Sequence, residues 1–310
     1  MLFLSADVHN STAFKNDPKH DGSVQGWLVT FKTFYSRFPT ALARKCASLN
    51  VSSPILWKLL GDELIFVVEL KSSGDSVQYV QSLREAIIQY NADWKRKNVG
   101  LAIKGTAWIA HFPVFNAEIK IEEPHDQNKF RTDYIGPAMD IGFRLAKLAT
   151  RRKLIVGADL ALLLLHTSND LRLYFDGKET LKGVLRDQPY PVIWADMHEE
   201  GKGSTEDALR GNSPPANKLK KYCETFIGEM KEVMALPFIE GDHDFNKKPA
   251  DWKTRFDRVC KAMQEEESEP LIQSTRAVKK KTPRKADSDA FLKLAVSQFL
   301  SANIKSIKPG

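Results

Sequence analysis

Two short apolar runs near the start of the chain show the clearest pattern of hydrophobic positions. Residues 55–60 and 64–68 are rich in branched aliphatic and aromatic side chains, and they flank Gly61-Asp62-Glu63. Apolar, β-prone runs separated by a short glycine-containing segment are typical of a β-hairpin. The pattern therefore predicts a tight hairpin between two buried strands, with the carboxylate of Asp62 at its turn.

The patterns around this hairpin predict an α+β fold. Residues 3–7 read as a short strand that ends at Asp7, and residues 27–42 carry apolar side chains at helical spacing. After the hairpin, residues 75–97 form a second amphipathic pattern, and residues 99–115 read as the next strand or strand pair. This βαββαβ order predicts a ferredoxin-like palm, in which helices cover one face of the sheet and leave the other face open.

The patterns up to residue 196 complete this first domain. Residues 116–129 are polar and predict a loop or a β-arm, and a helix is expected after Gly136-Pro137, because proline suits the first position of a helix. A strand, a short helix and the last strands of the domain are expected further on. They cover residues 153–156, 159–165 and 181–195.

The chain changes character after residue 196, so we divide it into a domain of residues 1–196 and an extension of residues 197–310. The extension begins with a Gly-, Ser-, Glu- and Pro-rich stretch that is typical of a linker. Helices are expected beyond it, and they cover residues 216–236, 250–265 and 290–304. The sequence predicts a helical extension, and its role stays open between dimer packing and partner contact.

Composition narrows the class of protein. The 310 residues are 42% hydrophobic and 27% charged, as in an ordinary globular protein, and no apolar run reaches the length of a membrane span. The chain enters a strand directly after Met1, without the basic start of a secretory signal. The cysteines are odd in number and widely spaced. We therefore expect a cytoplasmic protein without stable membrane insertion.

The formal net charge of +7 is partly concentrated in one late run, Lys279-Lys-Lys-Thr-Pro-Arg-Lys285. A run of this kind could bind nucleic acid. It lacks interleaved aromatic side chains, and a solvated linker explains it more simply. We therefore expect no nucleic-acid partner, and a nucleic-acid-binding protein remains a rival interpretation.

Two carboxylates point to metal chemistry. Asp7 ends the first predicted strand and Asp62 lies at the hairpin turn, so the palm topology places both at the ends of adjacent central strands. Neighbouring carboxylates repel unless a positive charge lies between them, and a divalent cation is the economical candidate.

Four segments, taken together and in order, resemble the motif series of the class III nucleotidyl cyclases. They are FLSADVHNST from residue 3, KLLGDE from residue 58, DYIGPAMDIGFRLAKLA from residue 133 and LKGVLRDQPYPVIW from residue 181. The resemblance covers residues 1–196. It implies the palm fold of a cyclase catalytic domain and an enzyme that converts a nucleoside triphosphate into a 3′,5′-cyclic nucleotide and pyrophosphate.

The resemblance assigns roles to individual residues. Asp7 and Asp62 match the family's aspartates that hold two divalent cations, Mn²⁺ or Mg²⁺, and Asn10-Ser11-Thr12 lies where backbone amides hold the triphosphate, with Asn10 in place of the usual glycine. Arg144 matches the arginine that stabilises the transition state. Asp140 replaces the usual asparagine that orients the ribose. Lys182 matches a lysine that holds the terminal phosphates.

The sequence allows two interpretations of the base specificity. Lys58 and Asp133 match the positions that read the base, and this pair is the adenine-reading combination, which favours an adenylate cyclase that makes cyclic AMP. A short chain in which Lys104-Gly-Thr-Ala-Trp-Ile-Ala110 replaces the usual Arg-x-Gly-Ile-x-x-Gly stretch is most similar to the bacterial pyrimidine cyclases of Pycsar anti-phage systems. These make cyclic UMP from UTP or cyclic CMP from CTP, which activates a separate effector. We prefer the second interpretation.

The resemblance also implies a head-to-tail homodimer with shared active sites. Asp7 and Asp62 of one subunit would then face five residues of the other, which are Lys58, Asp133, Asp140, Arg144 and Lys182. An inactive nucleotide-binding homologue of the cyclases remains an alternative. A diguanylate cyclase would need a Gly-Gly-acidic-Glu-Phe hairpin, which the sequence around Asp62 lacks.

Overall fold

The computed structural model describes residues 1–16, 24–123, 126–167, 171–197 and 213–268. The chain divides into two compact units, which are residues 1–111 with 137–248, and residues 112–136 with 249–310. Each unit is described by itself. No described helix has both the length and the apolarity that crossing a membrane requires.

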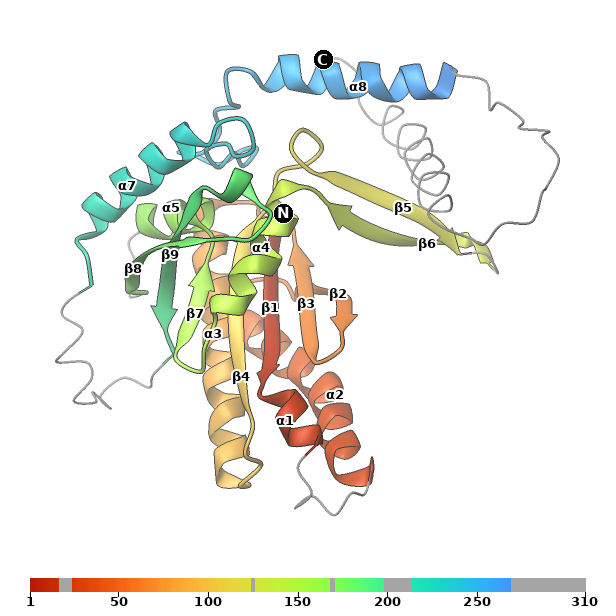
Figure 1. Cartoon of the computed structure of the whole chain (residues 1–310), viewed down its shortest axis with the longest axis vertical. Helices are drawn as coiled ribbons and strands as arrows, with labels where there is room; N and C mark the ends of the chain where they lie inside the picture. Colours follow the sequence, from red (N-terminus) through yellow and green to blue (C-terminus); the bar gives the residue numbers. More distant parts are fainter. Residues whose placement is uncertain (17–23, 124–125, 168–170, 198–212, 269–310) are drawn as a thin grey trace. The chain divides into compact units, whose positions relative to one another are not determined.

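The first unit is built on one seven-stranded sheet with the order β2-β3-β1-β4-β7-β9-β8. Figure 1 shows β1, in red, at the centre of its palm half, between β3 and β4. The strands are β1 (Leu2–His9), β2 (Ile55–Leu60), β3 (Glu63–Val68), β4 (Ala102–Ile109), β7 (Lys153–Val156), β8 (Leu173–Thr180) and β9 (Pro189–Asp196).

The palm topology predicted from the sequence is confirmed. The strands β2, β3, β1 and β4 pair with their neighbours in antiparallel fashion. Helices connect β1 to β2 and β3 to β4, and the hairpin turn connects β2 to β3, which makes the order βαββαβ. Among the described residues, the α-helices of the first unit are α1 (Ser11–Lys15), α2 (Val24–Ser48), α3 (Ser73–Arg96), α4 (Pro137–Leu145), α5 (Ala158–His166) and α7 (Ala216–Glu229).

Alternate side chains of β1 point to opposite faces of this sheet. Leu2, Leu4, Ala6 and Val8 are buried in the main hydrophobic core, together with apolar side chains of α2 and α3. The intervening residues therefore belong to the opposite face. There the ring of Phe3 stacks on Trp108 of β4, with the ring centroids 5.5 Å apart.

Close approach to Trp108 fixes the position of α4. Gly142 lies against the indole, so that a Cβ atom at this position would overlap the ring. The neighbouring Phe143 also contacts Trp108, with ring centroids 5.8 Å apart. Glycine is therefore needed at residue 142 for α4 to lie this near to β4.

Two sequence-based expectations on strands were wrong. The run 55–60 forms β2 as predicted, but β2 is the edge of the sheet rather than a buried strand, and Ile55 is 71% exposed. Its apolar composition does not reveal which strand lies at the edge, because neighbours in the sheet are set by tertiary pairing. The strand β8 was missed because its second half, Asp-Gly-Lys-Glu-Thr, is polar and exposed.

Part of the predicted extension belongs to the first unit. The helix α7 begins at Ala216 as expected but ends at Glu229, and its Leu219, Cys223, Phe226 and Ile227 are buried in the main core. The boundary at residue 196 stays a prediction. The predicted helix at residues 290–304 and the basic run at residues 279–285 lie outside the described residues.

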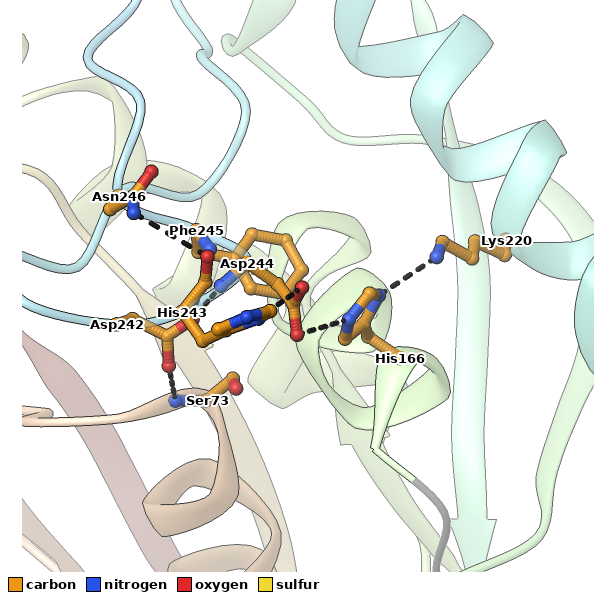
Figure 2. A network of polar contacts seen from close by, with 8 residues as sticks. All are labelled: Ser73, His166, Lys220, Asp242, His243, Asp244, Phe245 and Asn246. Atoms are coloured by element: carbon orange, nitrogen blue, oxygen red, sulfur yellow. Dashed lines mark hydrogen bonds and ion pairs between the residues drawn. The ribbon is translucent and has the colours of Figure 1, made fainter.

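A short loop after α7 is fastened to the palm through Asp242, which is 6% exposed (Figure 2). Its carboxylate accepts hydrogen bonds from the backbone N–H of Ser73 at 2.6 Å and from those of Asp244 and Phe245 at 2.9 Å. Ser73 is the first residue of α3, so the carboxylate also lies at the positive end of the helix dipole. Burial would raise the pKa of Asp242, but these hydrogen bonds lower it to about 2.

A second contact holds the same loop against α5. Figure 2 shows His166 between Asp244 and Lys220. Its Nε2 lies 2.9 Å from the Asp244 carboxylate, and its Nδ1 lies 2.8 Å from Nζ of Lys220. A lysine ammonium can only donate, so Nδ1 accepts and Nε2 carries the proton that is donated to Asp244. The imidazole thus joins α5, α7 and the loop.

Among its described residues, the second unit contains a two-stranded antiparallel arm and one helix. The strands β5 (Ala117–Glu123) and β6 (Asp126–Ile135) pair with each other, as expected for a β-arm, and α8 covers Trp252–Ser268. The guanidinium of Arg255 lies 4.8 Å from the centre of the Phe115 ring, which joins α8 to the residues before the arm.

Replacing Gly142 with alanine tests the contact with Trp108. We expect Gly142→Ala to lower the free energy of unfolding by about 2 kcal/mol, because the new methyl group forces α4 or the indole to move. Urea denaturation measures this change. Gly228→Ala is the matched control, since Gly228 is an exposed helical residue with no atom within 4 Å of an added Cβ. It should leave stability unchanged or raise it slightly. Equal effects of the two variants would contradict the role of Gly142.

The low pKa of Asp242 predicts a pH dependence of stability. A carboxyl group whose pKa is lowered by folding stabilises the folded state above its unfolded pKa, and this contribution disappears as the pH falls from about 4 to about 2. Asp242→Asn should therefore be less stable than the parent protein at pH 7 by about 1–2 kcal/mol, and the difference should shrink towards pH 2. Urea denaturation at several pH values measures it.

Asp93→Asn is the control for this experiment, because Asp93 belongs to an exposed ion pair with Arg96, and such pairs contribute little to stability. A difference between Asp242→Asn and the parent protein that stays constant with pH would show that the charge of Asp242 is not what holds the loop.

Candidate active site

The candidate site lies at the end of β1, on the face of the palm opposite α2 and α3. Asp7 is paired in register with Glu63 of β3 on one side and with Lys104 of β4 on the other. By the alternation of the strand, Asp7 shares its face with Phe3 and Ser5. Antiparallel pairing thus brings together two acidic residues and one basic residue that are far apart in the sequence.

An ion pair joins Asp7 to Lys104. Nζ of Lys104 lies 3.0 Å from Oδ2 of Asp7, and the two side chains are 15% and 22% exposed. The same ammonium donates a hydrogen bond to the carbonyl oxygen of Ala146 at 3.3 Å. Ala146 follows the end of α4 by one residue, so Lys104 links the central strand to the segment that carries Arg144.

Burial governs the protonation of these acids. It raises the pKa of Asp7, which Lys104 lowers and the nearby carboxylate of Asp62 raises again. Burial also raises the pKa of Glu63, whose carboxylate accepts a hydrogen bond from the hydroxyl of Ser5. Three carboxylates therefore share one ammonium, and when all are ionised they leave an excess of two negative charges.

Asp62 lies beside Asp7, as the hairpin pattern predicts. The turn of the hairpin consists of Gly61 and Asp62, and Gly61 has a positive φ of 65°, which glycine adopts without strain. The backbone N–H of Val8 donates to the carbonyl oxygen of Asp62 at 3.2 Å, so the turn is fastened to the end of β1. The structure brings the two predicted metal-binding aspartates within electrostatic range of each other.

The segment of residues 10–12 forms the start of the short helix α1 rather than an open loop. Asn10 precedes the helix with φ of 63° and ψ of 23°, which is the left-handed conformation. Glycine adopts this conformation readily, and asparagine is among the few other residues that tolerate it. This explains how Asn10 can occupy a backbone position that glycine would adopt without strain. Ser11 is buried and Thr12 is exposed.

Asp140 and Arg144 lie on α4, four residues apart and therefore on one side of the helix. Asp140 is exposed and Arg144 is half-buried. No ion pair joins these two residues, both of which the structure describes. The simple structural explanation of the pair, a salt bridge along the helix, is therefore not what the structure shows.

The remaining predicted residues belong to three other segments. Lys58 is in the edge strand β2, where Nζ lies 4.5 Å from the centre of the Trp57 ring. Lys182 is exposed in the turn after β8. Asp133 belongs to the second unit, on β6, where its carboxylate accepts a hydrogen bond from the backbone N–H of Tyr134 at 2.8 Å.

The donor set suits a hard divalent cation that the substrate completes. Within the part of the chain that the structure describes, no three His, Cys, Asp or Glu side chains converge on one point in a way that could hold a metal ion. Mg²⁺ in nucleotide sites is usually held by one or two carboxylates together with phosphate oxygens. Asp7 and Asp62 fit this arrangement, and they are the residues that would hold the ion.

Sequence reasoning missed Lys104 and Glu63 as members of the site. Lys104 was noted only as a departure from a family motif, and Glu63 as part of a turn. A signal was present in both cases, because each is a single charged residue within or directly before an apolar strand segment. Only the strand register, however, shows that both lie opposite Asp7.

Comparisons with known proteins give distant likenesses. No protein-family model matches the chain, and no curated protein matches it. Among solved structures, the adenylyl cyclase CyaB from P. aeruginosa is 10% identical, with a TM-score of 0.48 over 65% of this chain and 96% of that chain. The guanylyl cyclase Cya2 is 15% identical, with a TM-score of 0.41 over 66% of this chain and 95% of that chain.

A third solved structure is the guanylate cyclase domain of RhGC from Catenaria anguillulae in complex with GTP. It is 10% identical, with a TM-score of 0.43 over 63% of this chain and 94% of that chain. Likenesses this distant do not establish a family.

Proposed function

We propose that this protein is a metal-dependent nucleotidyl cyclase, which converts a nucleoside triphosphate into a 3′,5′-cyclic nucleotide and pyrophosphate. The observation that carries the proposal is the acidic cluster at the end of β1 of a βαββαβ palm, where the carboxylate of Asp62 lies close enough to Asp7 to raise its pKa. Their order in the chain, followed by Arg144 and Lys182, is the order of the cyclase motifs. Residues 1–196 would carry the chemistry, and the residues after them would serve packing or partner contact.

The proposed reaction is an attack of the ribose 3′-oxygen on the α-phosphate of the same nucleotide. Two divalent cations, Mn²⁺ or Mg²⁺, held by Asp7 and Asp62, would lower the pKa of the 3′-hydroxyl and draw negative charge from the phosphates. The guanidinium of Arg144 would stabilise the charge that develops at the α-phosphate, since it cannot lose its proton. Lys182 would bind the terminal phosphates, and the first amides of α1, at Ser11 and Thr12, would hold the triphosphate.

The active sites would be shared between two subunits arranged head to tail. Each site would combine Asp7 and Asp62 of one subunit with Arg144 and the other substrate-binding residues of its partner. The edge strand β2 supports an interface in this region, because four of its apolar side chains are exposed in the first unit. These are Ile55, Leu56, Leu59 and Leu60.

We further propose a pyrimidine substrate, so that the product is cyclic UMP or cyclic CMP. Such a product would serve as a second messenger in anti-phage defence and would act on a separate cyclic-nucleotide-responsive effector. The departures at Asp140 and Lys104 from the usual purine-cyclase residues support this choice. An adenylate cyclase is the second candidate, favoured by the adenine-reading pair Lys58 and Asp133, and Asp140 would then have to orient the ribose in place of asparagine.

The identity of the product tests the proposed function. Purified protein is incubated with Mn²⁺ and ATP, GTP, CTP or UTP in separate reactions, and the products are identified by mass spectrometry. We expect a cyclic pyrimidine nucleotide and pyrophosphate, and we expect Asp62→Asn to lower turnover by at least about a hundredfold with an unchanged melting temperature.

The outcomes of this experiment separate the proposals. Cyclic AMP would overturn the pyrimidine substrate and leave the cyclase in place. No product from any of the four nucleotides would contradict the cyclase and favour a nucleotide-binding homologue. Full activity of Asp62→Asn would remove Asp62 from the metal site, and Asp93→Asn serves as the control for the loss of one remote carboxylate.

Shared sites predict complementation between two inactive variants. Asp62→Asn and Arg144→Ala should each be nearly inactive alone, because each removes a group from both sites of a dimer. Mixing equal amounts should restore about a quarter of the parent activity, since half of the dimers are mixed and each has one intact site. A mixture that stays as inactive as its components, while gel filtration shows exchange of subunits, would place both residues in one subunit's site.

A further inference from the structure

Lys104 supplies a positive charge directly beside the carboxylates of the site. Its ammonium lies 3.0 Å from Oδ2 of Asp7, the residue that the proposed function assigns to the metal. The charge of Lys104 also lowers the pKa of Glu63. The protein therefore carries its own counter-ion for the acidic cluster.

Backbone pairing keeps this counter-ion in place. Lys104 and Asp7 are register partners on β4 and β1, two neighbouring strands inside the sheet. The hydrogen-bonded strands therefore hold the two side chains next to each other. The hydrogen bond from Nζ to the carbonyl oxygen of Ala146, at 3.3 Å, gives the ammonium a second partner. The pair is mostly shielded from water, so its charges interact more strongly than they would at the surface.

One ammonium balances only part of the local negative charge. Asp7, Asp62 and Glu63 leave an excess of two negative charges when they are ionised. A divalent cation is therefore attracted to the cluster, but it meets a positive charge that is already bound to one of its ligands. Binding of the metal must either displace the ammonium from Asp7 or accept the repulsion between the two cations.

We infer that Lys104 is an internal counter-ion that weakens metal binding to Asp7 and Asp62 until a nucleotide triphosphate is bound. The triphosphate brings its own negative charges, which offset the repulsion between the ammonium and the metal. Metal and nucleotide then bind with positive coupling, and the coupling is reciprocal. This inference rests on the proposed function, since it takes Asp7 and Asp62 as the metal ligands, and it assigns a regulatory role to a residue of the same site.

The test measures metal binding directly and without nucleotide. Mn²⁺ is titrated into the purified full chain, and free Mn²⁺ is followed by electron paramagnetic resonance. We expect Lys104→Met to bind Mn²⁺ about tenfold more tightly than the parent protein, because methionine fills a similar volume without the competing charge. Loss of this binding in the double variant that also carries Asp62→Asn would show that the ion is at the site.

Lys45→Met is the matched control. Lys45 forms an ion pair with Glu85 at 3.2 Å on the helical side of the sheet, so its replacement removes the same charge from a partly shielded pair elsewhere. It should leave Mn²⁺ affinity unchanged. If Lys104→Met does not fold, Lys104→Gln provides a second variant, whose neutral amide can still donate a hydrogen bond.

Each outcome decides the inference. Unchanged or weaker Mn²⁺ binding in a folded Lys104 variant would overturn it, and weaker binding would show instead that Lys104 positions Asp7 for the metal. Tighter binding in Lys45→Met to the same extent would also overturn it, because the effect would then follow net charge alone. Tighter Mn²⁺ binding in Lys104→Met with no cyclic product from any nucleotide would support the counter-ion and contradict the cyclase.

Discussion

The ion pair between Asp7 and Lys104 is the interaction on which the palm face opposite α2 and α3 depends. Asp7 stands on the central strand among apolar neighbours, where an isolated carboxylate would be costly because burial disfavours its charged form. Lys104 makes that charge tolerable, and its second hydrogen bond ties the end of α4 to the same point. Removing one partner of a mostly buried pair leaves an uncompensated charge, so the acidic cluster and its counter-ion form one unit.

The two faces of the sheet have different roles. One face of β1 packs into the core formed with α2 and α3, and this packing stabilises the strand order. The other face carries Phe3 and Trp108 at one end and the charged cluster at the other. Because Gly142 lets α4 lie directly on Trp108, the helix that bears Arg144 is positioned by packing against the same strand that carries Lys104.

The residues after 196 take part in the first unit more than their polar linker suggests. The helix α7 contributes four side chains to the main core, and the following loop caps the start of α3 through Asp242. A carboxylate that satisfies backbone N–H groups at a helix start gains from both hydrogen bonding and the helix dipole. This segment therefore stabilises the helical face of the palm, on the side of the sheet away from Asp7.

Local sequence pattern was sufficient to predict much of the fold of this protein. The hairpin around Gly61, the amphipathic helices α2 and α3, the start of α4 at Pro137 and the βαββαβ order all follow from short-range preferences and periodicity, and the structure confirms them. Asp7 and Asp62 could be placed near each other because that topology leaves few arrangements of the strands. The sequence by itself thus determined the class of fold and the position of its acidic pair.

Only the tertiary structure decided which side chains surround that pair and which strand is left at the edge. Lys104 and Glu63 are distant from Asp7 in the chain, and their meeting depends on strand register, in which a shift of one residue would turn each side chain to the other face. The apolar strand β2 reads as buried, yet no further strand of the first unit pairs beyond it among the described residues. Register and strand neighbours are set by packing of the whole core, because local preferences are nearly the same for each alternative.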